Sequence, residues 1–236
     1  MEQPPGYIDP HFPDHVCLLK KALYGLKQAP RAWFQRFSSF LLTLGFSCNR
    51  ADTSLFVFHQ QSNLIYLFLY VDDIIITGNN PSLLDSFACK LHSEFATKDL
   101  GSLSYFFGLE SSLTPDGLFL SQLKYARDIL TRAQLLDSKH VHTPMVVSQR
   151  LIADGSSFSD PTLYRSLVGA LQYLTITRLD IAYVVNSVSQ FLHAPTTDHF
   201  LAVKRILRYV KGTINFGLTL RPSTTPRVLV AYSDAD

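Results

Sequence analysis

The sequence predicts an α+β fold, in which helices and antiparallel strands occupy separate stretches of the chain. Three observations predict it. Two runs of large apolar residues at strand length, 54–59 and 64–77, follow each other across a short polar turn. Segments on both sides of them carry apolar residues at helical spacing, and the last third of the chain holds more segments of that kind. With 236 residues, the chain is long enough for one large or two small domains.

The first predicted helix begins at Pro30, a residue suited to the first helical position, and ends at Gly45. Its apolar side chains are Trp33, Phe37, Phe40, Leu41 and Leu44. In the predicted sheet, residues 60–63 form a polar turn between the two apolar runs. Asp72 and Asp73 interrupt the longer run and therefore mark a second turn, which gives up to three antiparallel strands.

A second helix is predicted after the sheet, because Asn80 can cap it and Pro81 suits its first turn. Its apolar stripe consists of Leu84, Phe87, Leu91 and Phe95. Two more strand-like pieces follow, 103–109 and 117–120, and a turn separates them. Ser121 is placed to cap a helix that continues to about residue 133.

Residues 141–159 contain Thr, Ser, Gln and Pro with little periodicity, which predicts a linker. Three helices are predicted beyond it, beginning at Asp160, at Asp180 and at Thr197. The last of them ends at Gly212.

The composition excludes several classes of protein. At 47% hydrophobic residues, disorder is not expected, yet no apolar run approaches the ~18 residues that span a bilayer. The N-terminal residues contain no basic leader with an apolar segment, so no secretory signal is predicted and a cytosolic or nuclear chain is implied. The three cysteines are widely spaced without a CxxC, which predicts neither a disulfide framework nor a zinc site. A net charge of +2 means that any nucleic-acid binding must depend on local clusters of basic residues.

Asp72 and Asp73 are the first candidates for chemistry. Mg²⁺ takes oxygen ligands and is usually held through one or two carboxylates together with substrate phosphates. Two such ions are a standard device for nucleotidyl transfer. On spacing alone, a solvated acidic turn is the commoner explanation for such a pair. The apolar strands on both sides favour a metal site, because they would hold the carboxylates on a rigid scaffold.

Several segments carry a resemblance to a known family. The tetrad Tyr70, Val71, Asp72 and Asp73 resembles the catalytic hairpin of reverse transcriptases, and LYGLKQAPRAW, 23–33, is similar to a signature of the copia-type retrotransposon subgroup. Four further segments are similar to the family in the same order: KDLGSLSYFFGLE, GLFLSQLKYARDIL, YRSLVGALQYLTITRLDIAYVVN and AVKRILRYVKGT. The resemblance covers essentially the whole chain.

The resemblance implies a partial right-hand polymerase palm with an antiparallel catalytic hairpin, followed by a helical thumb and connection segment. Residues 1–145 would be the C-terminal part of the palm and the thumb, 146–226 a helical connection region, and 227–236 the first strand of a ribonuclease H domain. The family activity is RNA-directed DNA synthesis with two Mg²⁺ ions, an RNA/DNA template-primer and dNTP. No membrane partner is implied, and the compartment would be the cytoplasm, in virus-like particles, or the nucleus.

In the family pattern, Asp72 would coordinate metal, Asp73 would assist at the primer end, and Tyr70 would lie beneath the incoming nucleotide. Gln28 and Arg31 would lie near the nucleotide and the template base, where an amide both donates and accepts and a guanidinium matches phosphate. Without the resemblance, a water-exposed helix entry is the commoner explanation for Gln28 and Arg31.

Phe106, Phe107 and Gly108 resemble the strand that grips the primer, although plain core packing explains one of the two phenylalanines as well. Two basic clusters could follow the phosphates of an RNA/DNA hybrid, with binding that weakens as salt rises. The first consists of Lys20, Lys21, Lys27, Arg31 and Arg36. The second consists of Lys204, Arg205, Arg208 and Lys211. For the second cluster, a solvated helix face is an equally good interpretation.

The closing sequence AYSDAD resembles the first strand of ribonuclease H, with Asp234 as its first metal ligand. The other acidic ligands of that site do not occur in these residues, so no nuclease activity is expected. His140 and His142 alternate along an extended stretch without an evident third ligand, and a surface pair is the preferred interpretation.

The family's polymerase site takes a third aspartate from a strand that would precede MEQPPGY. We therefore expect an incomplete metal site and no polymerase activity from these residues alone. Leu179 stands where the family usually has proline, which affects only the rigidity of a turn. Two alternatives stay open: a non-catalytic nucleic-acid-binding remnant, and an unstable pseudogene product, because an incomplete palm exposes a sheet edge and apolar surface.

Overall fold

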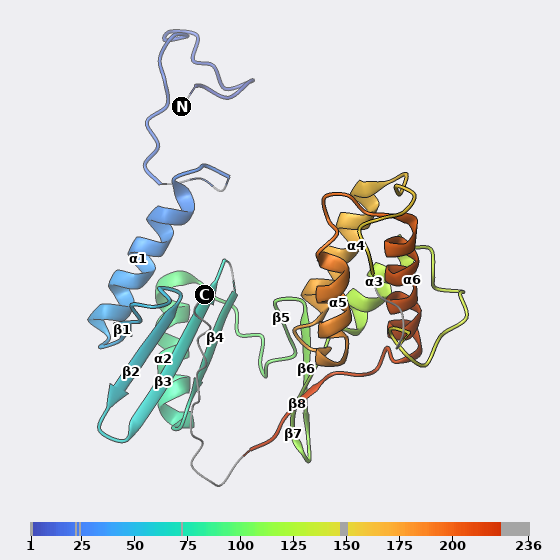
Figure 1. Ribbon diagram of the computed structural model, residues 1–236. Helices are drawn as coiled ribbons and strands as arrows, with labels where there is room; N and C mark the ends of the chain where they lie inside the picture. Colours follow the sequence, from blue (N-terminus) through green and yellow to red (C-terminus); the bar gives the residue numbers. More distant parts are fainter. Residues whose placement is uncertain (1, 22, 24, 72, 147–150, 223–236) are drawn as a thin grey trace. The chain divides into compact units, whose positions relative to one another are not determined.

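The computed structural model describes residues 2–21, 23, 25–71, 73–146 and 151–222 (Figure 1). Helices and strands are both present, and the strands form two antiparallel sheets, as the predicted α+β class requires. Contacts within the chain divide it into two compact units, Met1–Asp99 and Leu100–Asp236. The family segments 1–145, 146–226 and 227–236 are a different division, and they stay a prediction.

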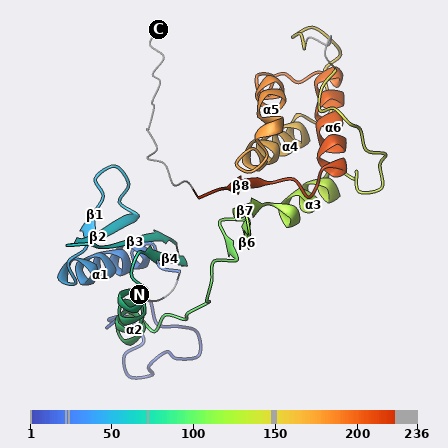
Figure 2. The same cartoon turned by 90° about the horizontal axis from the view of Figure 1, so that it is seen from below.

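In the first unit, one helix precedes a four-stranded antiparallel sheet and another helix follows it. The elements are α1 (Ala29–Thr43), β1 (Ser47–Cys48), β2 (Leu55–Gln60), β3 (Asn63–Tyr70), β4 (Asp73–Gly78) and α2 (Pro81–Phe95). Each strand pairs with its neighbour in the chain, in the order β1-β2-β3-β4. Both helices lie on the same side of this sheet (Figure 2).

The core of the first unit lies between this sheet and the two helices. Along β3, Ile65, Leu67 and Leu69 are buried, whereas Tyr66 and Tyr70 are exposed, because successive side chains point to opposite faces of a strand. The rest of the cluster consists of Phe37, Leu41, Phe46, Phe56, Phe87 and Leu91. The inward faces that the sequence spacing predicts for the two helices are therefore confirmed, except at Trp33, which is 37% exposed.

Local signals fix the helix ends of this unit. Asn80 caps α2 as predicted, because its side-chain oxygen accepts the N–H of Leu83 at 3.3 Å. Pro30 lies in the first turn of α1, where its missing N–H costs no helical hydrogen bond. Gly45 follows the end of α1 with a φ of 91°, a left-handed conformation that glycine adopts without a steric penalty.

The second unit combines a second antiparallel sheet with a group of helices. Its strands are β5 (Tyr105–Phe106), β6 (Leu109–Thr114), β7 (Gly117–Ser121) and β8 (Leu218–Leu220), in the order β5-β6-β7-β8. Its helices are α3 (Leu123–Arg132), α4 (Pro161–Leu174), the 3-10 helix η1 (Leu179–Ile181), α5 (Ala182–Ser189) and α6 (Thr197–Gly212). The helices lie together beside this sheet (Figure 2).

Helix α4 supplies the centre of the second core. Its buried side chains include Tyr164, Leu167, Val168, Leu171 and Leu174, which recur at helical spacing. They pack with buried residues of α3, α5 and α6. The hydroxyl of Tyr164 donates to the carbonyl oxygen of Val188 at 2.7 Å, and burial raises the pKa of Tyr164 to about 12. Tyr164 therefore links α4 to α5 through a satisfied polar contact inside an apolar core.

A capping box starts α6. The hydroxyl of Thr196 accepts the N–H of His199, and the Nδ1 of His199 accepts the N–H of Thr196 at 3.0 Å. The other ring nitrogen, Nε2, lies 2.9 Å from the carbonyl oxygen of Ile152. Burial lowers the pKa of His199, although that carbonyl and Asp198 oppose the shift. A neutral ring suits this position, because one nitrogen must accept while the other donates.

The structure differs from the predicted secondary structure at three places in the second sheet. The stretch 103–109 is not one strand, because Phe107 and Gly108 form a two-residue turn between β5 and β6, with φ angles of 58° and 71°. Strand β6 continues to Thr114 through polar residues, so its sequence shows no apolar alternation. Strand β8 was not predicted, since three residues are too few to show a period.

The predicted cap of α3 is also wrong. Ser121 is the last residue of β7, and Gln122 stands at the N-cap, but its side chain makes no capping hydrogen bond to the helix. The N–H of Lys124 is satisfied instead by the side-chain oxygen of Glu110 in β6, at 2.8 Å. A carboxylate from a neighbouring strand thus replaces the local cap, and sequence distance hides that contact.

Candidate functional site

The hairpin between β3 and β4 carries the predicted catalytic residues. Its last pair in the ladder is Tyr70 with Asp73, so the chain reverses directly after Tyr70. The second turn is confirmed at the predicted place, although Asp73 itself is the first residue of β4. Asp72 lies outside the described residues. Val71 has a φ of 51° and is 70% exposed. A β-branched residue in the left-handed region is a strained exception, and strain of this kind clusters at functional sites.

Strand alternation decides on which face Asp73 lies. Ile74 pairs with Leu69 and packs on the core, so its neighbour Asp73 belongs to the opposite face of the sheet together with its partner Tyr70. Asp73 is exposed, and Tyr70 is 40% exposed. A carboxylate and a phenol thus lie side by side at the tip of a rigid hairpin, on the face opposite α1 and α2.

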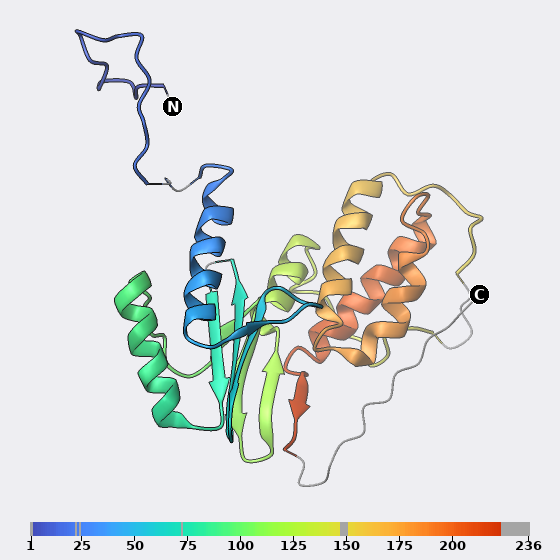
Figure 3. The same cartoon turned by 90° about the vertical axis from the view of Figure 1, so that its left-hand side faces the viewer.

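Gln28 and Arg31 lie at the start of α1. Gln28 is its N-cap without a side-chain hydrogen bond, and both residues are exposed. Helix α1 begins at the same end of the sheet as the β3–β4 turn (Figures 1 and 3). The structure therefore brings this helix start and the carboxylate hairpin to one end of the first unit.

The first basic cluster divides into two groups. Lys20, Lys21, Lys27 and Arg31 are exposed, in the segment that leads into α1 and in its first turn. Arg36 differs, because it makes an ion pair with Glu94 of α2 at 2.6 Å and lies over the Phe95 ring. Four exposed charges are thus available to solvent near the start of α1, whereas Arg36 connects the two helices.

The predicted primer-grip residues lie at the β5–β6 turn. Phe106 ends β5 and is half-buried, while Phe107 is 37% exposed and occupies the turn with Gly108. The two phenylalanine rings contact each other, with centroids 5.4 Å apart. The ring of Phe106 is therefore more buried than the ring of Phe107. At the turn, the Phe107 ring is the more exposed of the two and lies next to the backbone of Gly108.

The second basic cluster makes internal contacts that the sequence did not predict. Arg205 donates to the hydroxyl of Thr143 at 2.7 Å, and Arg208 donates to the carbonyl oxygen of Lys139 at 2.6 Å. Lys211 donates to the carbonyl oxygen of Ser138. Lys204 lies over the ring of Phe200. The face of α6 that carries these residues therefore holds the segment 138–143, and all four side chains are half-buried.

The metal predictions fall largely outside the described part of the chain. Asp72 and Asp234 are not described, so the Mg²⁺ site and the ribonuclease H ligand stay predictions. Within the described residues, no group of three or more His, Cys, Asp or Glu could hold a metal ion. His140 and His142 have ring centroids 5.4 Å apart and belong to no such group.

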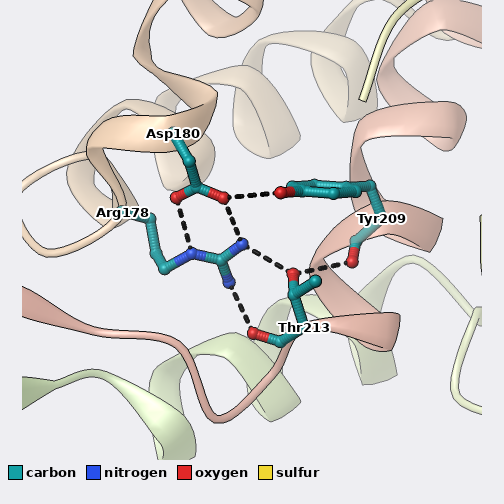
Figure 4. Close-up of polar contacts among 4 residues, drawn as sticks. All are labelled: Arg178, Asp180, Tyr209 and Thr213. Carbon is teal, nitrogen blue, oxygen red and sulfur yellow. Dashed lines mark hydrogen bonds and ion pairs between the residues drawn. The ribbon is translucent and has the colours of Figure 1, made fainter. Parts of the chain in front are cut away.

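A buried ionic network centred on Arg178 was not predicted from the sequence (Figure 4). Arg178, with 2% of its side chain exposed, donates to both carboxylate oxygens of Asp180, at 2.9 and 2.8 Å. Its other donors reach the carbonyl and hydroxyl oxygens of Thr213, at 3.0 and 2.6 Å. The hydroxyl of Tyr209 donates to Asp180 at 3.0 Å. One guanidinium therefore connects the segment of η1 to the C-terminal end of α6.

The charge of Asp180 depends on this network. Burial on its own would raise the pKa of Asp180, but the hydrogen bonds and charge of Arg178, together with the Tyr209 hydroxyl, hold that pKa below its usual value. The only hint in the sequence is the short spacing of Arg178 and Asp180, which does not reveal the third partner, Thr213. We assign this network to the stability of the second unit.

Among the described residues, none of the helices is both long and apolar enough to cross a membrane.

Comparisons with known proteins agree with the sequence motifs. Residues 1–147 match the family model described as reverse transcriptase (RNA-dependent DNA polymerase). The whole chain is 51% identical to the Retrovirus-related Pol polyprotein from transposon RE1 of Arabidopsis thaliana, of which it spans 16%. It is 37% identical to the Retrovirus-related Pol polyprotein from transposon TNT 1-94 of Nicotiana tabacum, of which it spans 18%.

A shorter relative matches over most of its own length. The chain is 32% identical over 238 residues to the putative transposon Ty5-1 protein of Saccharomyces cerevisiae and covers 77% of it. No solved structure is significantly similar to the chain.

Proposed function

Because this chain belongs to the reverse transcriptase family of copia-type retrotransposon Pol polyproteins, we propose that it binds an RNA/DNA template-primer and carries part of the polymerase active site on its β3–β4 hairpin. It spans 16% of the two Arabidopsis polyproteins it matches at about half identity, so the activity of a whole polyprotein is a proposal for this chain.

The hairpin is the observation that carries the proposal. A two-residue turn with a left-handed Val71 places Tyr70 and Asp73 side by side on a short, fully paired strand end. A turn that served only to reverse the chain would be expected to use Asn-Gly or Asp-Gly, which adopt positive φ angles at less cost. The strained valine is better explained by a functional requirement on its neighbours.

The donors at this turn suit Mg²⁺. Asp73 is an exposed carboxylate on a paired strand, and Asp72, the residue before it in the sequence, is a second carboxylate. When bound, Mg²⁺ would polarise phosphate oxygens and neutralise the charge that develops there. The residues themselves would position the ion and, through Tyr70, contact the nucleotide. Two carboxylates from one hairpin are few ligands for two ions, so we propose that these 236 residues alone do not extend a primer.

The exposed basic residues supply the second half of the proposal. Lys20, Lys21, Lys27 and Arg31 lie before and within the first turn of α1, and that helix begins at the same end of the sheet as the hairpin (Figures 1 and 3). Phosphates approaching this end would meet four positive charges that lack an acidic partner among the described residues. Such contacts release counterions and make binding salt-dependent.

Binding of a labelled RNA/DNA hybrid across a salt series tests the proposal. We expect saturable binding at each salt concentration. The logarithm of the association constant should fall linearly with the logarithm of the salt concentration. Single-stranded RNA and a protein of equal charge serve as controls. Absence of saturable binding at low salt would contradict the proposal.

A further inference from the structure

The β5–β6 hairpin is too short to hold its own conformation. Strand β5 has two residues, and its ladder with β6 consists of the pairs Tyr105 with Glu110 and Phe106 with Leu109. A strand pair of this length is not stable alone in water. Its turn adds strain, because Phe107 has a φ of 58°, in the left-handed region that side chains disfavour. Something outside the hairpin must therefore keep this turn in place.

Tyr173 of α4 is the residue that reaches the turn. Its hydroxyl donates a hydrogen bond to the carbonyl oxygen of Phe107, 66 positions away in the sequence. A Cβ added to Gly108 would lie 3.0 Å from the same hydroxyl oxygen, so the hydroxyl leaves little room for a side chain at that position. Tyr173 thus holds the carbonyl group of Phe107 and restricts which residue position 108 accepts.

Tyr173 is itself well supported. It lies one residue before the buried Leu174, on the helix with the largest share of the buried residues in the second core. Its ring meets the ring of Tyr125 on α3 edge to face, with centroids 5.0 Å apart. Such an aromatic pair restricts the ring and therefore the direction in which the hydroxyl points.

We infer that Tyr173 is a positioning residue that holds the β5–β6 turn so that Phe107 and the backbone of Gly108 are presented to the template-primer. This inference rests on the proposed function for its ligand. The contact between α4 and the turn is an independent observation. A hydroxyl fixed by a core helix would keep the strained turn in one conformation, and the ligand would not have to order it on binding.

The change Tyr173→Phe removes the hydroxyl and keeps the ring. We expect the dissociation constant for an RNA/DNA hybrid to rise roughly three- to tenfold, as for the loss of one neutral hydrogen bond. The salt dependence should stay unchanged, since no phosphate contact is removed. The amide of Ser111, which donates to Ser104 across this hairpin at 2.9 Å, should exchange its hydrogen faster, while amides of α6 keep their rates.

Tyr125→Phe is the matched control. It removes the hydroxyl from the other ring of the same pair. Among the described residues, no hydrogen bond is found for the Tyr125 hydroxyl. We expect hybrid affinity, exchange of Ser111 and melting temperature to match the unchanged chain. A second test uses Gly108→Ala, which should weaken binding less when Tyr173→Phe is also present, because the clash with the hydroxyl is then gone.

The outcomes separate the inference from the proposed function. If Tyr173→Phe binds the hybrid and exchanges Ser111 as Tyr125→Phe does, the inference is overturned. If the unchanged chain fails to bind any hybrid, the proposed function is contradicted. In that case the exchange of Ser111 alone decides whether Tyr173 holds the turn.

Discussion

Replacing Arg178 by methionine is expected to lower the free energy of unfolding of the second unit by about 3 kcal/mol, because removing one partner of a buried pair leaves the other uncompensated. The guanidinium has 2% of its side chain exposed and serves two oxygens of Asp180 and two of Thr213 (Figure 4). Asp180 has 34% of its side chain exposed, which lets water compensate in part and places the loss at the lower end of the usual range for a broken buried pair.

Urea unfolding measures this loss, with Arg165→Met as the matched control. Arg165 is an exposed arginine on α4 whose only hydrogen bond found among the described residues reaches Thr162 at 3.4 Å. The same chemical change there should shift stability by no more than about 0.5 kcal/mol. Equal stability of Arg178→Met and Arg165→Met would contradict the account of the network.

The pH dependence of stability gives an independent check on the same network. The pKa of Asp180 is lowered in the folded chain, so its contribution is present above the ordinary aspartate pKa and is lost as pH falls through the lowered value. Arg178→Met removes the main cause of that lowering. The variant should therefore lose less stability than the unchanged chain as pH falls below the ordinary aspartate range.

Neutralising four basic residues is expected to have the largest effect on binding. Changing Lys20, Lys21, Lys27 and Arg31 to glutamine should weaken hybrid binding by about 100-fold at moderate salt and flatten the salt dependence by roughly three to four units. These residues are exposed in the segment that leads into α1 and in its first turn, and α1 begins at the end of the sheet where the β3–β4 hairpin turns (Figures 1 and 3). The stability of the fold should change little, since their side chains contribute no ion pair among those found in the described residues.

The matched control for this variant removes the same total charge elsewhere. It changes four other exposed basic residues to glutamine: Lys90, Lys98, Arg127 and Arg132. If the two variants weaken binding equally, net charge rather than the surface near α1 accounts for affinity, and the assigned surface is wrong.

Local signals explain which elements could be predicted from sequence. Helix α2 was predictable from its Asn80 cap and from apolar residues at helical spacing. Helix α4 was predictable from Asp160, whose side chain accepts the N–H of Leu163 at 2.9 Å. The β3–β4 hairpin was predictable because two carboxylates stand out within a long apolar run. In each case the stabilising partner lies within a few positions of the residue that gives the signal.

Contacts between distant residues explain the failures. The turn at Phe107 is held by Tyr173, and the cap of α3 is supplied by Glu110. The basic face of α6 meets the segment 138–143, which carries no regular pattern of its own. For Arg178 the sequence shows only a charge, while the structure shows that this charge connects the η1 segment to the C-terminal end of α6. Such partners become visible only when the chain has folded.

Primer extension with Mg²⁺ tests the central claim most directly. We expect no incorporation by these 236 residues alone. We expect incorporation when they replace the matching region of the polyprotein from transposon RE1, and its loss in Asp72→Asn of that fusion. Undiminished incorporation by the Asp72→Asn fusion would contradict a catalytic role for the hairpin. Incorporation by the 236 residues alone that disappears in Asp72→Asn would show instead that the two carboxylates suffice.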